Sequence, residues 1–159
     1  MDRRPLPLEA HALPRAGLLG NPSDLYGGAV IAFTFSAFRA RVRIEPAGSE
    51  DEAGSLAGSL VVDWPRAPQL EPLALDGLPR LVAAALRRFV DRFPLPTPGA
   101  TERILLRAST DIPRQVGLAG SSAVVVATLR ALAAWQGREI APLELAEMAL
   151  AAETEELNT

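Results

Sequence analysis

The stretch "VGLAGSSAVVV", Val116 to Val126, places two glycines and two adjacent serines directly before a run of apolar residues. The apolar run predicts a helix buried on most sides, with Ser121 and Ser122 in its first turn. Glycine lets a backbone approach a ligand closely, and a helix N-terminus offers unpaired N–H groups and a partial positive charge. This combination is typical of a phosphate-binding loop, to which serine hydroxyls add hydrogen-bond donors or ligands for Mg²⁺.

Two other roles are open to these serines. Either one could simply cap the helix, but capping explains one serine and not the whole set of glycines and serines. A nucleophilic serine is disfavoured, because "GSSAV" lacks the second glycine of a nucleophile elbow and His11 is the only histidine. All 16 basic residues are arginine. The absence of lysine excludes a Walker-type phosphate loop, Schiff-base chemistry and a Ser-Lys dyad.

The composition limits the class of protein further. The chain has 159 residues, of which 48% are hydrophobic and 22% charged, as expected for one folded domain. Its net charge of -3 argues against a nucleic-acid partner, and the absence of cysteine excludes disulfides and thiolate metal sites. No signal peptide and no apolar segment of about 18 residues is visible. We therefore expect a cytoplasmic protein with small-molecule partners, no nucleic acid and no membrane; the sequence does not indicate an oligomeric state.

Periodicity predicts strands followed by a helix, a strand and two helices, an α+β pattern with a mixed or antiparallel sheet. Residues 1–14 are expected to be a Pro-rich, loosely ordered lead-in, and "AGSEDEAGS" (47–55) a hairpin loop. The strands are expected at 15–20, 29–38, 40–46, 56–65 and 102–109. The helices are expected from an N-cap at Asp76 to about Phe93, from Ser121 to Trp135, and from Pro142 almost to the end of the chain.

Two motifs resemble those of the GHMP kinases, the superfamily of galactokinase, homoserine kinase, mevalonate kinase and phosphomevalonate kinase. "PRQVGLAGSSA" is similar to their phosphate loop, and "PRAGLLGNPSDLYGG" to their first motif, a strand with a basic residue followed by a Gly and a polar substrate loop. Both occur in the family order. The resemblance implies a GHMP kinase N-terminal, ATP-binding domain over 15–159, of the ribosomal-protein-like fold, with helices on one side of a mixed or antiparallel sheet. The family's third motif and C-terminal domain are expected beyond Thr159, so the chain looks truncated.

The resemblance also implies residue roles. Arg15 would supply fixed positive charge near the reacting hydroxyl, and Asn21, Asp24 and Tyr26 would contact the substrate. The nucleotide phosphates would lie against Gly117, Leu118, Ala119, Gly120, Ser121, Ser122 and Ala123. Ser122 and Glu153 would bind Mg²⁺. Structural roles are also open: a solvated Arg15, an Asx turn at Asp24, packing at Tyr26 and an acidic helix end at Glu153.

"GNPSD" departs from the galactokinase form of the first motif and is similar to that of the glucuronokinases. A neutral Asn21 in place of an acidic residue suits a substrate that is itself a carboxylate. The resemblance therefore implies a kinase that uses ATP and Mg²⁺ to phosphorylate a sugar hydroxyl, the anomeric one of a glucuronate-like sugar acid. Galactose or a heptose as substrate, or a non-catalytic nucleotide-binding fragment, are the alternatives. The general base is expected beyond Thr159, so we expect these 159 residues alone to be inactive.

Overall fold

The computed structural model describes residues 3–20, 26–48, 59–64, 76–93 and 102–156. Four strands form an antiparallel sheet in the order β1-β4-β6-β5, made of β1 (Leu8–Ala12), β4 (Ala40–Pro46), β6 (Glu102–Thr110) and β5 (Ser59–Trp64). A separate antiparallel ribbon pairs β2 (Arg15–Leu19) with β3 (Ile31–Thr34). The strands expected from Arg15 onward are confirmed, with β3 shorter than expected.

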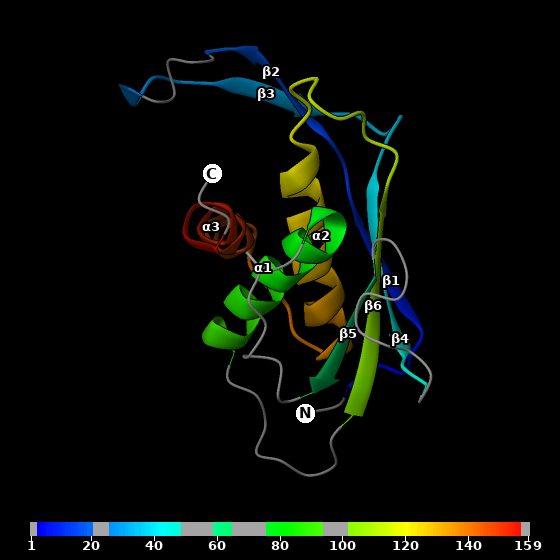
Figure 1. Ribbon diagram of the computed structural model, residues 1–159. Coiled ribbons are helices and arrows are strands. Elements are labelled where there is room, and N and C mark those ends of the chain that lie inside the picture. Colours follow the sequence, from blue (N-terminus) through cyan, green and yellow to red (C-terminus); the bar gives the residue numbers. More distant parts are fainter. Residues whose placement is uncertain (1–2, 21–25, 49–58, 65–75, 94–101, 157–159) are drawn as a thin grey trace.

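Three helices and a short π-helical turn complete the fold: α1 (Gly77–Arg92), α2 (Gly120–Trp135), α3 (Pro142–Ala151) and η4 (Ala152–Glu156). Figure 1 shows α1 and α2 against one face of the sheet, α3 against the helices, and the β2–β3 ribbon projecting past the end of α2. The predicted α+β architecture with helices on one side of the sheet is confirmed. Within the described residues, no helix is both long and apolar enough to cross a bilayer.

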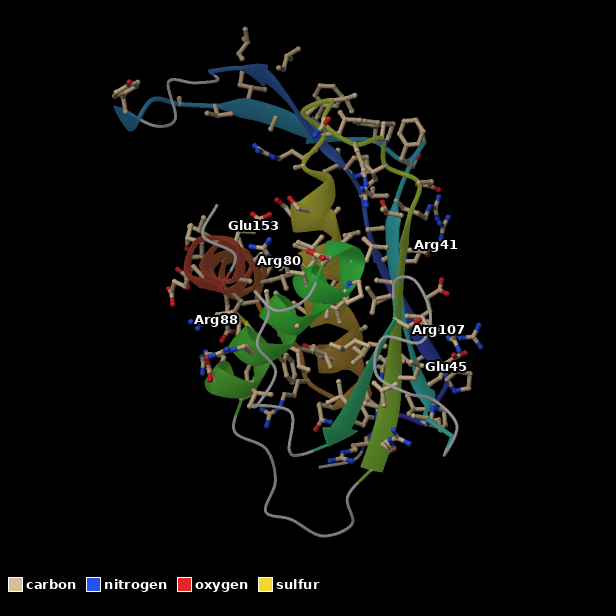
Figure 2. The ribbon with its side chains drawn as sticks, in the orientation of Figure 1. Arg41, Glu45, Arg80, Arg88, Arg107 and Glu153 are labelled. Atoms are coloured by element: carbon tan, nitrogen blue, oxygen red, sulfur yellow. The ribbon has the colours of Figure 1, made fainter. Side chains whose placement is uncertain are left out.

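The alternation in β4 explains why the sheet has one covered and one open face. Val42 and Ile44 are fully buried beneath the helices, whereas the side chains between them point to the other side. There, Glu45 accepts from Arg43 Nε and Arg107 Nε, each at 2.8 Å. Arg43 and Arg107 are cross-strand partners, so this carboxylate relieves the repulsion between two facing arginines (Figure 2).

The helix α2 has more buried residues than α1 or α3. Ten of its sixteen residues are buried, among them Leu129, Leu132 and Trp135, which agrees with the expectation of a helix apolar nearly all round. The one buried hydroxyl on this helix, that of Thr128, donates to Val124 O at 2.8 Å. Such a helix has little freedom to shift, so its N-terminus is held in place by the core.

Two expectations are wrong. The segment Leu8–Ala12, within the expected loose lead-in, forms the edge strand β1. Its Leu8, Ala10 and Ala12 face the core, while Glu9 and His11 are exposed. This alternation was not recognised because prolines surround it. The strands β4 and β5 are not hairpin neighbours, because β6 inserts between them. Asp76 does hold the N-cap position of α1, although its side chain makes no capping hydrogen bond.

Truncating the core at α2 should destabilise the domain strongly. Leu129 is completely buried, so Leu129→Ala removes apolar contacts and leaves a cavity. We expect the free energy of unfolding to fall by about 2–5 kcal/mol. Leu143→Ala is the matched control, because Leu143 is 73% exposed and its truncation should change little. Urea titration followed by circular dichroism measures both; equal losses would contradict the described core.

Candidate active site

The loop between β6 and α2 has an unusual backbone. Gln115, Gly117 and Ala119 have positive φ angles of 59°, 76° and 51°, although two of the three are not glycine. A left-handed conformation costs a non-glycine residue roughly 1 kcal/mol or more and persists only where the surroundings impose it. Backbones that pass in and out of this conformation turn successive N–H groups toward a common side and form anion-binding concavities. The loop therefore has the geometry expected of a phosphate cradle.

Contacts at both ends fix this loop. At its start, the Asp111 carboxylate accepts from the Arg39 backbone N–H and, at 3.4 Å, from Arg41. The Arg39 N–H, with help from the Arg41 charge, lowers the pKa of Asp111 below its usual value of 3.8, although its limited burial opposes the shift. At the other end, Arg15 N donates to Leu118 O at 3.2 Å, which ties the loop to β2.

The first turn of α2 meets the end of α3 at a carboxylate. The Ser122 hydroxyl lies 2.8 and 3.0 Å from the two carboxylate oxygens of Glu153, and the Ser121 hydroxyl lies 3.1 Å from one of them. Glu153 belongs to η4, and π-helical turns are frequent at functional sites. The structure thus brings together three residues that the sequence separates by about thirty positions, and Figure 2 shows Glu153 on the helical side of the sheet.

Two clefts flank this turn. The larger, of about 570 Å³, is lined by the loop from Ile112 to Ser121, the start of α1 and Glu153. We call it the nucleotide cleft. The smaller, of about 330 Å³, lies on the other side of the turn, where it is lined by Arg15, Thr34, Ser122 and Arg130. We call it the acceptor cleft. Ala119 borders both, so a group bound in one cleft is separated from the other only by the start of α2.

The predicted site residues divide into three groups. Every predicted phosphate-loop residue, together with Arg15 and Glu153, lines one of the two clefts. Tyr26 lies between β2 and β3 in the chain, lines neither cleft and is 88% exposed. Asn21 and Asp24 lie outside the described residues.

Sequence reasoning missed several polar residues of these clefts, of which four matter most for charge and for the acceptor side. Arg80 and Arg114 line the nucleotide cleft, and Thr34 and Arg130 line the acceptor cleft. Arg114 could have been predicted from the sequence, because it lies within the loop motif itself. Arg80 looked like a residue of the solvated face of α1, and the spacing of Thr34 and Arg130 indicated nothing. Figure 2 shows Arg80 near Glu153, on the opposite side of the sheet from Arg41.

The oxygen atoms at the turn fit a divalent cation. Ser122 offers a hydroxyl and Glu153 a carboxylate at mutual distances below about 3 Å. No cluster of three or more His, Asp or Glu suited to a metal occurs among the described residues. Mg²⁺ commonly uses one or two carboxylates and completes its coordination with water and substrate phosphates.

The sequence matches the family described as "GHMP kinases N terminal domain" over residues 80–159, which contain the phosphate loop and Glu153. The chain belongs to the GHMP kinase family. Glucuronokinase 1 of Arabidopsis thaliana is 32% identical to it over 131 residues, which make 79% of this chain and 36% of that protein.

Solved GHMP kinases share the fold. The mevalonate kinase of Methanococcus jannaschii matches with a TM-score of 0.75 at 18% identity, over 96% of this chain and 47% of that one. A D-glycero-D-manno-heptose 1-phosphate kinase from Bacteriodes thetaiotaomicron matches with a TM-score of 0.70 at 24% identity, over 94% of this chain and 49% of that one. The chain therefore spans about half the length of these structures and about a third of the curated relative.

The anchoring of the phosphate loop by Asp111 predicts a pH dependence. Because the folded pKa lies below the unfolded one, ionised Asp111 stabilises the fold above its ordinary pKa, and this contribution disappears as the pH falls through the lowered value. Asp111→Asn should therefore lower the Tm at about pH 7 and lower it progressively less toward about pH 2. Thermal unfolding across that pH range measures the difference in Tm between the variant and the unaltered protein. A Tm difference that does not change with pH would show that the Asp111 charge is not involved.

Proposed function

We propose that the protein is an ATP- and Mg²⁺-dependent sugar kinase whose acceptor is a sugar acid resembling glucuronate, with residues 15–159 forming its nucleotide-binding domain. The observation that carries this proposal is the position of Ser122, which lies at the helix N-terminus between two clefts and within 2.8 Å of Glu153. Phosphoryl transfer requires a nucleotide and an acceptor on opposite sides of the transferred group, with charge stabilisation between them.

In this proposal, α2 and its loop hold the phosphates. The first N–H groups of α2 have no acceptor within the helix, and the Ser121 and Ser122 hydroxyls add donors beside them. Ser122 and Glu153 would hold Mg²⁺, which neutralises phosphate charge when bound. Arg114 and Arg80 line the same cleft and bring positive charge to it.

The acceptor cleft carries the argument for the substrate class. Among the residues that the structure describes, the charged ones that line this cleft are Arg15 and Arg130, and both are cationic. Arg15 would stabilise the charge that develops at the reacting hydroxyl, and a second arginine favours an acceptor that carries a negative charge of its own. The 32% identity to a glucuronokinase points to the same class. Galactose, a neutral sugar, gives Arg130 no ionic partner and is the less favoured alternative.

The test is a comparison of acceptors in the complete protein. With Mg²⁺ and ATP, glucuronate should give a kcat/KM at least about tenfold above that of galactose, the effect of one charge-assisted contact. ³¹P NMR of the product identifies the phosphorylated hydroxyl. Preferential turnover of galactose or a heptose would contradict the sugar-acid assignment, and ATP binding without turnover of any sugar would favour a non-catalytic binding module.

A matched pair of serine variants ties the activity to this site. Ser122→Ala removes the hydroxyl that we assign both to phosphate binding and to Mg²⁺ binding, and it should lower kcat about 10²-fold. Ser109→Ala removes an exposed hydroxyl from β6 and should leave kcat unchanged. Similar rates for the two variants would place the chemistry elsewhere.

A further inference from the structure

A third cleft lies at the opposite end of α2 from the phosphate loop. It has a volume of about 360 Å³ and is formed by the chain before β1, the C-terminal half of α2 and the start of α3. The helix α2 spans sixteen residues, about 24 Å, and this cleft lies against its C-terminal half, whereas Ser122 is in its first turn. Within the described ranges, the cleft's charged lining residues are Arg4, Arg130 and Arg138, and no described Asp or Glu lines it. We call it the distal arginine cleft.

Among the residues described, these three arginines lack an ionic contact that six other arginines of the domain make. Six arginines elsewhere have a carboxylate oxygen within 3.4 Å: Arg3, Arg41, Arg43, Arg88, Arg92 and Arg107. Within the described part of the chain, no carboxylate lies within ion-pair distance of Arg4, Arg130 or Arg138. Glu144, the acidic residue in the first turn of α3, pairs at 2.6 Å with Arg92 instead. Three like charges in one cleft repel each other unless an anion joins them.

The arginines are held in position without being neutralised. The Arg138 guanidinium lies 4.9 Å from the centre of the Phe93 ring, a contact that orients the group but leaves its charge. Arg130 Nη1 donates to His11 O at 3.0 Å, and Arg4 N donates to Trp135 O at 2.9 Å. A guanidinium has five donors, so most remain for a ligand. The start of α3 adds the partial positive charge of a helix N-terminus, which no side chain caps.

We propose that the distal arginine cleft binds a small phosphate ester. Several arginines converging from separate segments suit a multiply charged oxyanion, which accepts several charge-assisted hydrogen bonds at once. The rest of the lining, Ala133, Ala134, Ile140, Pro142 and Leu145, is apolar and gives the carbon skeleton of an ester a surface to contact. The volume is at the small end of the range for ligand sites, which favours a small ester over a nucleotide. This site goes beyond the proposed kinase activity, although it shares the lining residue Arg130 with the acceptor cleft.

The test is an NMR titration of the ¹⁵N-labelled complete protein with α-D-glucose 1-phosphate and, separately, with inorganic phosphate. The ester should cause saturable shifts of the Arg138, Leu143 and Leu145 amides, and it should bind more tightly than inorganic phosphate. Because Arg130 also borders the acceptor cleft, Arg4 and Arg138 are the residues to change. The variant R4Q/R138Q should raise the Kd of this site at least about tenfold.

Two controls separate binding at the cleft from a general charge effect. R39Q/R43Q removes the same number of charges from arginines on and beside β4 and should leave the Kd unchanged. If R4Q/R138Q does not fold, R4Q alone is the test. Arg4 is exposed, so R4Q should fold and should bind the ester more weakly. Shifts that never saturate at the cleft, or a Kd unaffected by R4Q/R138Q, would overturn the proposal. Equal affinity for inorganic phosphate would overturn the assignment to an ester.

Discussion

Burial of α2 is the constraint on which the rest of the site depends. Ten of its sixteen residues lie in the core, so packing against the sheet and α1 fixes the position and direction of its N-terminus. The phosphate loop must end at that point, and α3 and η4 must pack where they bring Glu153 against Ser122. The site that we propose binds a highly charged ligand is thus positioned by an almost wholly apolar element, whose contribution is rigidity.

The loop spans two fixed points at some conformational cost. Its beginning is held by the Asp111 carboxylate and its end by the core, and between them Gln115 and Ala119 adopt left-handed conformations that glycine would adopt more easily. Anchoring at both ends explains how such a backbone is held in place. In the proposed function, N–H groups that are already oriented would need less ordering when phosphate binds, which is the usual advantage of a preorganised site.

Much of this could be predicted from sequence, and the failures have physical causes. The loop motif and the buried helix depend on local patterns, whereas Glu153 was named through the family resemblance; in the structure all three meet at the start of α2. The strand β1 was missed because prolines surround a short alternating segment, and the insertion of β6 between β4 and β5 is a tertiary pairing that no local pattern encodes. Thr34 and Arg130 reach the acceptor cleft only through packing of distant segments, so their spacing carried no signal.

The central claim is that Ser122 and Glu153 hold a divalent cation beside nucleotide phosphates. A crystal structure of the protein with Mn²⁺ and a non-hydrolysable ATP analogue tests it directly, because Mn²⁺ replaces Mg²⁺ and is located by its anomalous scattering. The account predicts one anomalous peak within coordination distance of Ser122 Oγ and a Glu153 carboxylate oxygen, about 2.0–2.2 Å away, with the analogue's phosphates along the loop at the start of α2. A nucleotide bound away from that loop, or a cation that contacts neither side chain, would contradict it.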